Sequence, residues 1–437
     1  MAHTSSVEWW RPIRATLPAA PVEARGAGAG ATPFWALMAF TFVLLLAPQS
    51  FIPVLEPFRV ALLVAVIATA TYLWAVLIHR QALGVRSREA LLAIGLAGWA
   101  ALTVPFSYAP SNSLAFILNA YGKTLIVFWL VGSVVNSLKK LRQAFWVLTL
   151  LAIPLALTAI AHFFSGVYLA PTGTLRISGY EAPLTGNPND LALMLNLILP
   201  LSMALLLIRR RPAIRFFLLA AMSLSAAGII ITFSRAGFLA LASLLILYLW
   251  KLRRRPERRW AWGLIPLLIV CIPLLGPTYL ERLSTITNME ADKTGSAQER
   301  WKDMTAAARF AAGHPIAGSG IGQNVLAVRE ERGPEGGMVH NVYLEYAVEL
   351  GLPGLALFLL LFLACLKSAA LVQRRARSTN TDELFYIGEA LQISLIAFGI
   401  EAIFHPVAYH IYFYYIAGLA VAAKNVSQSD RALHGSN

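Results

Sequence analysis

Long apolar runs, separated by short polar stretches, make up most of the chain. A helix that crosses a membrane needs about 20 predominantly apolar residues, and the sequence contains about twelve runs of that kind. The expected spans are residues 33–54, 57–79, 89–106, 113–136, 143–165, 189–208, 215–233, 236–252, 261–279, 352–373, 384–404 and 408–424. The pattern therefore predicts an all-α polytopic membrane protein.

The polar connections between these runs differ in charge. The basic ones contain Arg80/Arg86/Arg88, Lys139/Lys140/Arg142, Arg209/Arg210/Arg211/Arg215, Lys251/Arg253/Arg254/Arg255/Arg258/Arg259 and Arg374/Arg375/Arg377. Because Lys and Arg collect on the cytoplasmic side of membrane proteins, these connections all fit if the amino terminus is cytoplasmic. The segment 1–32 and the tail 425–437 are then cytoplasmic, while 166–188 and 280–340 fall outside, which in a Gram-negative cell is the periplasm.

Composition agrees with a membrane protein. The chain is 58% hydrophobic and 13% charged, about half the charge of a typical soluble domain, and its mean hydropathy is +0.64. The net charge of +14 lies mainly in the short connections, so nucleic-acid binding is not expected. The first apolar run is too long for a cleavable signal peptide. Cys271 and Cys365 lie inside apolar runs and give no redox information.

The segment 280–351 separates the spans of 33–279 from those of 352–424, and we expect a structured periplasmic loop that ends in an interfacial helix. Ser296-Ala-Gln-Glu299 is a capping box, which predicts a helix start. An unbroken helix over 341–373 would be about 50 Å long, which exceeds the roughly 30 Å of a bilayer core. Gly351-Leu-Pro-Gly354 is the expected break.

His340 is the first candidate for chemistry, because it follows the outer loop and precedes this interfacial helix. Neutral imidazole is a common general base near neutral pH. The functional interpretation is a base that takes a proton from a sugar hydroxyl; the alternative is an interfacial histidine that caps a helix. The adjacent Asn341 is a candidate supporting residue. His314, His405 and His410 fall on the same membrane face, either lining this cavity or as solvated loop residues.

Three arginines on the expected outer face are candidates for binding phosphate. The guanidinium group is planar, permanently charged and suited to phosphate oxygens. Arg176 precedes Gly186-Asn-Pro-Asn-Asp190, Arg235 lies in a tight turn between two apolar runs, and Arg300 lies in the outer-loop helix. The alternative for Arg176 is an exposed loop arginine, and for Arg300 an ordinary surface residue. An arginine in an outer turn departs from the positive-inside pattern, so Arg235 needs an anionic ligand or a carboxylate.

Other polar residues have two open interpretations each. Asn189 and Asp190 could support the site or, as we expect, cap the following helix. Lys123 near the middle of the fourth span could contact a ligand or pair with Glu401 or Glu349. The stretch Gly318-Ser-Gly-Ile-Gly322 could cradle phosphate, but a plain turn is favoured. No HExxH or CxxC spacing is present, so no metal site is expected.

Taken together, these motifs resemble the O-antigen ligase/polymerase family of bacterial membrane glycosyl transferases. The resemblance rests on the Arg176–Asp190 loop, the Ser234-Arg-x-Gly237 turn, Gly320-x-Gly322 at the end of the outer loop, and His340-Asn-x-x-Leu-Glu345. It covers about residues 170–355 by motif. It implies a GT-C-like helical fold, with His340, Arg176, Arg235 and Arg300 as the essential histidine and arginines.

The resemblance also implies glycosyl transfer without a cofactor, metal or nucleotide at the periplasmic face of the inner membrane. The donor would be an undecaprenyl-diphosphate-linked glycan and the acceptor lipid A-core, so that the product is lipopolysaccharide. We expect one inverting displacement, with His340 as base and the arginines as diphosphate clamp. A polymerase or a protein O-oligosaccharyltransferase of the same family stays open. A polysaccharide or lipid transporter is the alternative from another class, although no internal repeat supports it.

Overall fold

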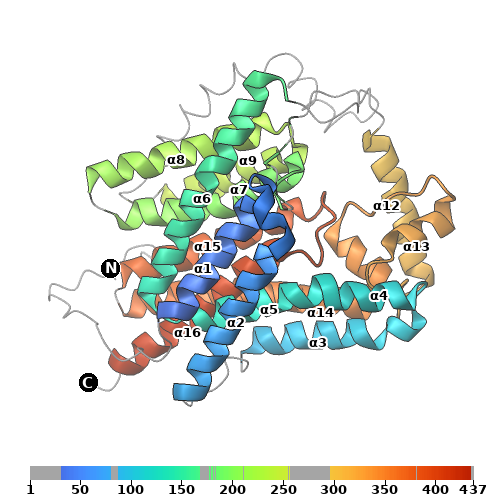
Figure 1. Cartoon of the computed structure of the whole chain (residues 1–437), viewed down its shortest axis with the longest axis horizontal. Coiled ribbons are helices and arrows are strands. Elements are labelled where there is room, and N and C mark those ends of the chain that lie inside the picture. The colour runs from blue at the N-terminus through green and yellow to red at the C-terminus, as the bar shows by residue number, and fades with distance from the viewer. Residues whose placement is uncertain are drawn as a thin grey trace, which may run out of the picture.

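The computed structural model describes residues 31–79, 87–167, 177–209 (apart from 178, 181 and 183), 211–255 (apart from 254) and 296–434 (apart from 380). These residues form helices and their connections. The helices are α1 (Ala31–Leu46), α2 (Val60–His79), α3 (Arg88–Leu102), α4 (Pro110–Phe116), α5 (Gly122–Val134), α6 (Leu138–Ser165), α7 (Pro188–Ile208), α8 (Pro212–Ile231), α9 (Arg235–Leu252), α12 (Ser296–Gly313), α13 (Asn324–Arg332), α14 (Val342–Ser378), α15 (Asp382–Glu401) and α16 (Ile411–His434). Figure 1 labels them.

Nine helical segments of the described chain are long and apolar enough to cross a membrane, which confirms the all-α polytopic class. The expected span 33–54 is wrong at its end, because α1 stops at Leu46. Pro48 and Pro53 then begin short 3-10 turns, and proline lacks the N–H that would continue a helix. The expected span 261–279 lies outside the described residues, and the span expected at 408–424 forms the first part of α16.

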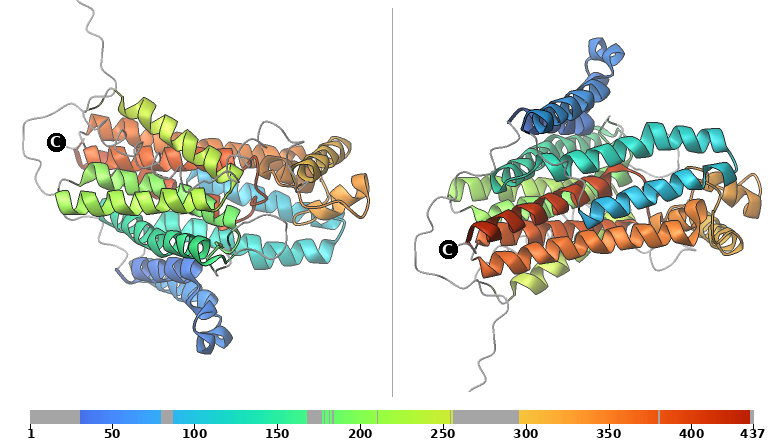
Figure 2. Two further views of the ribbon diagram at one scale, coloured as in Figure 1. Left: turned by 90° about the horizontal axis from the view of Figure 1, so that it is seen from above. Right: turned by 90° about the horizontal axis from the view of Figure 1, so that it is seen from below.

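Helix α7 is the centre of the bundle. Of the residues in its most apolar stretch, 94% are buried, compared with 11% for the segment Val54–Ile78 that contains α2. It packs against α6, α8, α9 and α15, and its apolar side chains therefore face protein on all sides. In Figure 2, α1 and α2 lie at one side of the bundle, where α1 packs against α5 and α6.

Basic residues from several of the described connections lie at one end of the bundle. Arg142 pairs with Glu383 (3.2 Å) and Arg255 with Glu389 (2.9 Å), while Lys424 pairs with Glu89. These contacts join the starts of α3, α6 and α15 to the ends of α9 and α16. The basic connections therefore share one end of the bundle, as the charge pattern predicts.

Helices α12 and α13 cover the opposite end, which we call the capped end (Figures 1 and 2). Helix α14 begins there and is interrupted at Gly351, whose φ of 68° and ψ of −174° are not helical. The break confirms the prediction for Gly351–Gly354 and separates a short segment, 342–350, from the long membrane-spanning part. Trp99 of α3 donates a hydrogen bond to the Leu350 carbonyl (2.8 Å), which fixes the end of the short segment.

Candidate active site

His340 lies at the capped end, two residues before α14 begins. The side chain of the intervening Asn341 accepts a hydrogen bond from Leu344 N (2.9 Å), so Asn341 is the N-cap of α14. Val342 N donates to the Ala402 carbonyl (2.8 Å) and thereby ties the start of α14 to the end of α15. These backbone contacts place the half-buried His340 where α12, α14 and the α15–α16 connection meet.

The His340 ring is neutral and oriented. Burial lowers its pKa to about 4, and the positive charge of Arg300 contributes in the same direction. The ring contacts the Met338 carbonyl through Nδ1 at 2.8 Å. Because a carbonyl only accepts, Nδ1 carries the proton in the neutral ring, and Nε2 keeps its lone pair. His340 therefore presents an unprotonated nitrogen at neutral pH, as a general base must.

Arg300 belongs to α12 and is half-buried. Its charge acts on His340, so the fold brings together these two residues, which are 40 positions apart in sequence. Asp303, one helical turn after Arg300, is 6% exposed. Its carboxylate accepts a hydrogen bond from Gly337 N (3.1 Å) and pairs with Arg332. Asp303 therefore anchors the segment that leads to His340.

Asn324 anchors the same segment from α13. Its side-chain oxygen accepts a hydrogen bond from Val339 N (3.2 Å), and its amide nitrogen donates to Glu349 (2.6 Å). Asp303 and Asn324 belong to none of the motifs described for the sequence. The i, i+3 spacing from Arg300 to Asp303 was the available signal for the former. Nothing local in the sequence indicates Asn324, because its partners are distant in the chain.

The Gly318–Gly322 stretch is a turn, and three of its backbone N–H groups donate hydrogen bonds to other parts of the protein. The Glu349 carboxylate accepts from Gly322 N (2.8 Å), and the Glu349 carbonyl accepts from Gly320 N (2.9 Å). Ser319 N donates to the Val348 carbonyl (2.8 Å). The turn therefore holds the loop against the short segment of α14, in agreement with the favoured interpretation, and these groups do not face a phosphate.

We expect Gly318→Ala to destabilise the protein by about 1–3 kcal/mol, because φ is +65° there and a Cβ would overlap the Val348 carbonyl. The matched control is Gly313→Ala, where a Cβ meets nothing within 4 Å. Denaturant or thermal unfolding in detergent measures both. Equal stability of the two variants would show that the turn is not held by α14.

Asp190 lies in the first turn of α7, also at the capped end. The expectation that Asn189 or Asp190 caps this helix is wrong: Asn187 is the N-cap and accepts a hydrogen bond from Asn189 N (2.9 Å). Pro188 occupies the first helical position, where its fixed φ is favourable, so the cap is the residue before it, Asn187, two positions before Asn189. Asp190 instead pairs with His405, with 2.9 Å between Oδ1 and Nε2.

Arg235 is half-buried at the start of α9. It follows a tight turn in which Phe233 has a φ of 54° and Ser234 caps the helix by accepting from Gly237 N (3.2 Å). Asn196 of α7 donates to the Gly237 carbonyl (3.0 Å). This contact places the first turn of α9 beside the first half of α7. Arg176 lies outside the described residues.

Lys123 does not occupy the position expected for it. The residue is exposed on α5. Its two expected partners are buried and bonded elsewhere: Glu401 accepts from Asn196 (2.7 Å), and Glu349 accepts from Gly322 N and Asn324. The helical register, with its π-helical turn at Ile117–Tyr121, points Lys123 away from the bundle interior. It is therefore not part of the cluster around His340.

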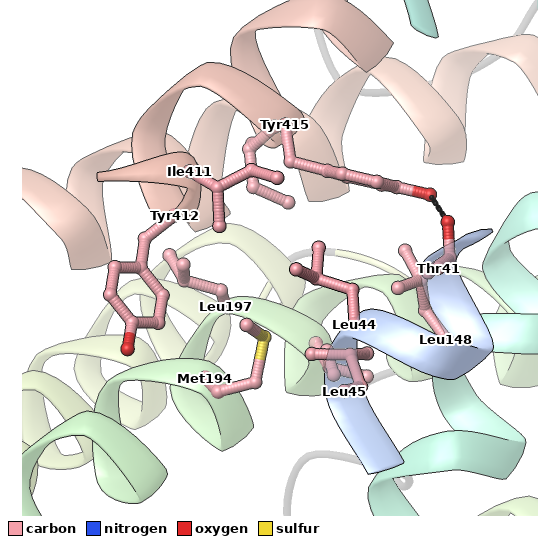
Figure 3. A pocket seen from close by; sticks show the side chains of 11 residues that line it. Thr41, Leu44, Leu45, Leu148, Met194, Leu197, Ile411, Tyr412 and Tyr415 are labelled. Atoms are coloured by element: carbon pink, nitrogen blue, oxygen red, sulfur yellow. Dashed lines mark hydrogen bonds between the residues drawn. The ribbon is translucent and has the colours of Figure 1, made fainter. Parts of the chain in front are cut away.

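An apolar pocket lies between α1, α6, α7 and α16 (Figure 3). Its volume is about 360 Å³, and part of this volume is open to the surroundings. The lining residues are Thr41, Leu44, Leu45, Leu148, Met194, Leu197, Ile198, Ile411, Tyr412, Tyr415 and Ile416. Tyr412 lines the pocket, donates to the Leu184 carbonyl (2.7 Å) and lies beside Asp190. The pocket therefore adjoins the Asp190–His405 pair.

Comparison with known proteins adds a separate line of evidence. Residues 220–359 match the family model described as O-antigen ligase. No curated protein matches the chain. The matched region runs from α8 into α14 and includes Arg235, Arg300 and His340. The chain is thus a polytopic membrane protein in which residues 220–359 match the O-antigen ligase model.

Proposed function

We propose that this protein is an O-antigen ligase. It transfers a glycan from an undecaprenyl-diphosphate donor to lipid A-core. The observation that carries the proposal is His340, neutral and with Nε2 available, beside the charge of Arg300 and within the O-antigen ligase domain. A base next to a permanent cation suits a reaction in which a hydroxyl loses a proton while a diphosphate leaves.

The proposed reaction is a single displacement with inversion. The acceptor hydroxyl gives its proton to His340 Nε2 while its oxygen bonds to the anomeric carbon of the donor. The bond from that carbon to the diphosphate oxygen breaks, and the electron pair leaves with the diphosphate. Arg300, Arg235 and Arg176 stabilise this charge. The imidazolium then releases its proton to water, which restores the base.

The distribution of charge supports an orientation for the reaction. The basic connections lie at the end of the bundle opposite the capped end, and such residues mark the cytoplasmic side. The capped end then faces the periplasm, and both termini are cytoplasmic. The inner membrane of a Gram-negative cell is the location where a lipid-linked donor and lipid A-core meet on that face.

The diphosphate also explains why the pKa of His340 need not limit the reaction. Burial and the charge of Arg300 lower this pKa in the protein without substrate. A bound diphosphate offsets the Arg300 charge, so the pKa of His340 rises when the donor binds. The base then becomes stronger in the complex in which it is needed.

The test uses purified full-length protein with undecaprenyl-diphosphate glycan, with and without lipid A-core. Glycan attached to lipid A-core is the expected product. Extension of the donor glycan without lipid A-core would identify a polymerase instead. Transfer to neither acceptor would contradict the proposal and favour the transporter alternative. Analysis of the anomeric configuration of the product tests inversion separately.

A further inference from the structure

His405 and Asp190 form a pair of side chains at the capped end that the proposed reaction does not use. His405 Nε2 lies 2.9 Å from Asp190 Oδ1, and the two side chains are 6% and 21% exposed. Because a carboxylate accepts hydrogen bonds, it holds the proton of the imidazole on Nε2. When the ring is neutral, its lone pair is then on Nδ1. A carboxylate orients the catalytic histidine of serine proteases in the same manner.

The second ring nitrogen of His405, Nδ1, has no hydrogen-bond partner in the described part of the chain. The whole His405 residue, backbone included, is 4% exposed, and its Nδ1 is buried without a hydrogen-bond partner among those residues. Buried polar atoms are almost always hydrogen-bonded, because an unmade bond costs free energy. A buried acceptor that the protein orients through Asp190 but does not satisfy indicates a donor from elsewhere.

The connection that carries His405 is fixed beside His340. On one side of His405, the Ala402 carbonyl accepts from Val342 N (2.8 Å); on the other, Ala408 N donates to the buried Glu345 (3.3 Å). Both contacts are made with the first turn of α14, which begins two residues after His340. The two imidazoles thus belong to one site.

We propose that His405 Nδ1, oriented by Asp190, accepts a hydrogen bond from a hydroxyl group of the glycan during transfer. This inference rests on the proposed function. A diphosphate oxygen would not serve, because it is also an acceptor and the Asp190 carboxylate repels it. Sugar hydroxyls are donors and are abundant in both substrates. Since Nδ1 is covered by neighbouring side chains, the contact forms only when the glycan displaces them.

Two substitutions of His405 separate recognition from a structural role. His405→Gln places an amide near the position of Nε2, so it keeps the contact with Asp190 and loses the Nδ1 acceptor. His405→Asn places an amide near Nδ1, so its oxygen can accept from a hydroxyl, but the contact with Asp190 is lost. We expect kcat/KM for glycan transfer to fall about tenfold or more in His405→Gln and by less in His405→Asn.

The substrate that supplies the hydroxyl is identified by its own kinetics. The KM for donor glycan or for lipid A-core, whichever provides the hydroxyl, is expected to rise in His405→Gln. A version of that substrate lacking the hydroxyl should have a lower kcat/KM with the wild-type enzyme. With this version, His405→Gln should have the same kcat/KM as wild type. Asp190→Asn, which can donate as well as accept, is the second variant if His405→Gln does not fold, and we expect the same loss of kcat/KM.

The outcomes distinguish this inference from the proposed function. Transfer by wild type together with unchanged kinetics in His405→Gln or Asp190→Asn would overturn the inference alone. Normal activity in His405→Gln with a loss in His405→Asn would show that the pair only holds the fold, and would also overturn it. Absence of transfer by wild type would overturn both. The expected order, with His405→Gln the slower variant, supports hydroxyl recognition.

Discussion

Replacing His340 with alanine is expected to lower kcat for glycan transfer by about 10²–10⁴-fold, the usual contribution of a general base. The loss should appear in kcat more than in the KM for the donor, because the ring acts on the acceptor proton while arginines hold the diphosphate. His340→Gln should be equally slow, since an amide is not basic. Steady-state transfer assays with donor and lipid A-core measure both variants.

His314→Ala is the matched control for this prediction. His314 is also a histidine of the capped end, but its ring stacks on Phe310 at 4.2 Å and its Nδ1 contacts the carbonyl of the same residue. We expect its loss to leave kcat within about threefold of wild type, because its ring packs on Phe310 and takes no part in the proposed proton transfer. A His340→Ala enzyme as active as this control would remove His340 from the mechanism.

Replacing Arg300 with glutamine is expected to lower kcat/KM by about 10²–10³-fold, as loss of one group that stabilises transition-state charge does in other enzymes. It should also change the pH dependence. Burial and then the Arg300 charge lower the pKa of His340 to about 4. Without the cation, protonation of the ring is easier and its pKa rises. The acid limb of kcat/KM, which reports the free enzyme, should therefore move to higher pH.

Arg309→Gln on the same helix is the control for Arg300. Arg309 is exposed and pairs with Glu331 at 3.3 Å, and exposed pairs contribute little to stability. Its pH profile and rates should match those of wild type. An unchanged acid limb in Arg300→Gln, with normal behaviour of the control, would mean that Arg300 does not influence His340 in solution.

The break in α14 shows what local sequence can predict. An uninterrupted apolar and amphipathic stretch from 341 to 373 is longer than a bilayer is thick, and Gly351 is the residue best suited to a positive φ. The capping box Ser296–Glu299 likewise lies at the described start of α12, Ser296–Gly313. Both features depend on residues that are neighbours in the chain, and therefore the sequence contains the relevant information.

Pairings between distant residues could not be predicted in this way. Asp190 was expected to cap a helix because it stands at a helix start, yet Asn187 does so and Asp190 pairs with His405. Lys123 was expected to contact a ligand or to pair with Glu401 or Glu349, yet the register of α5 leaves it exposed and both acids are bonded elsewhere. Each outcome depends on which helix faces pack together, and a short stretch of sequence does not determine this packing.

The sequence by itself determined the helical membrane class, the common end of the basic connections, the break at Gly351 and His340 as the candidate base. Periodicity, charge and bilayer thickness suffice for these because they act over one helix at a time. Only the tertiary structure decided that Arg300 lies near His340, that Asp303 and Asn324 anchor the segment before it, and that His405 is joined to Asp190. Those contacts link residues 15 to 215 positions apart, and packing of the whole bundle is needed to form them.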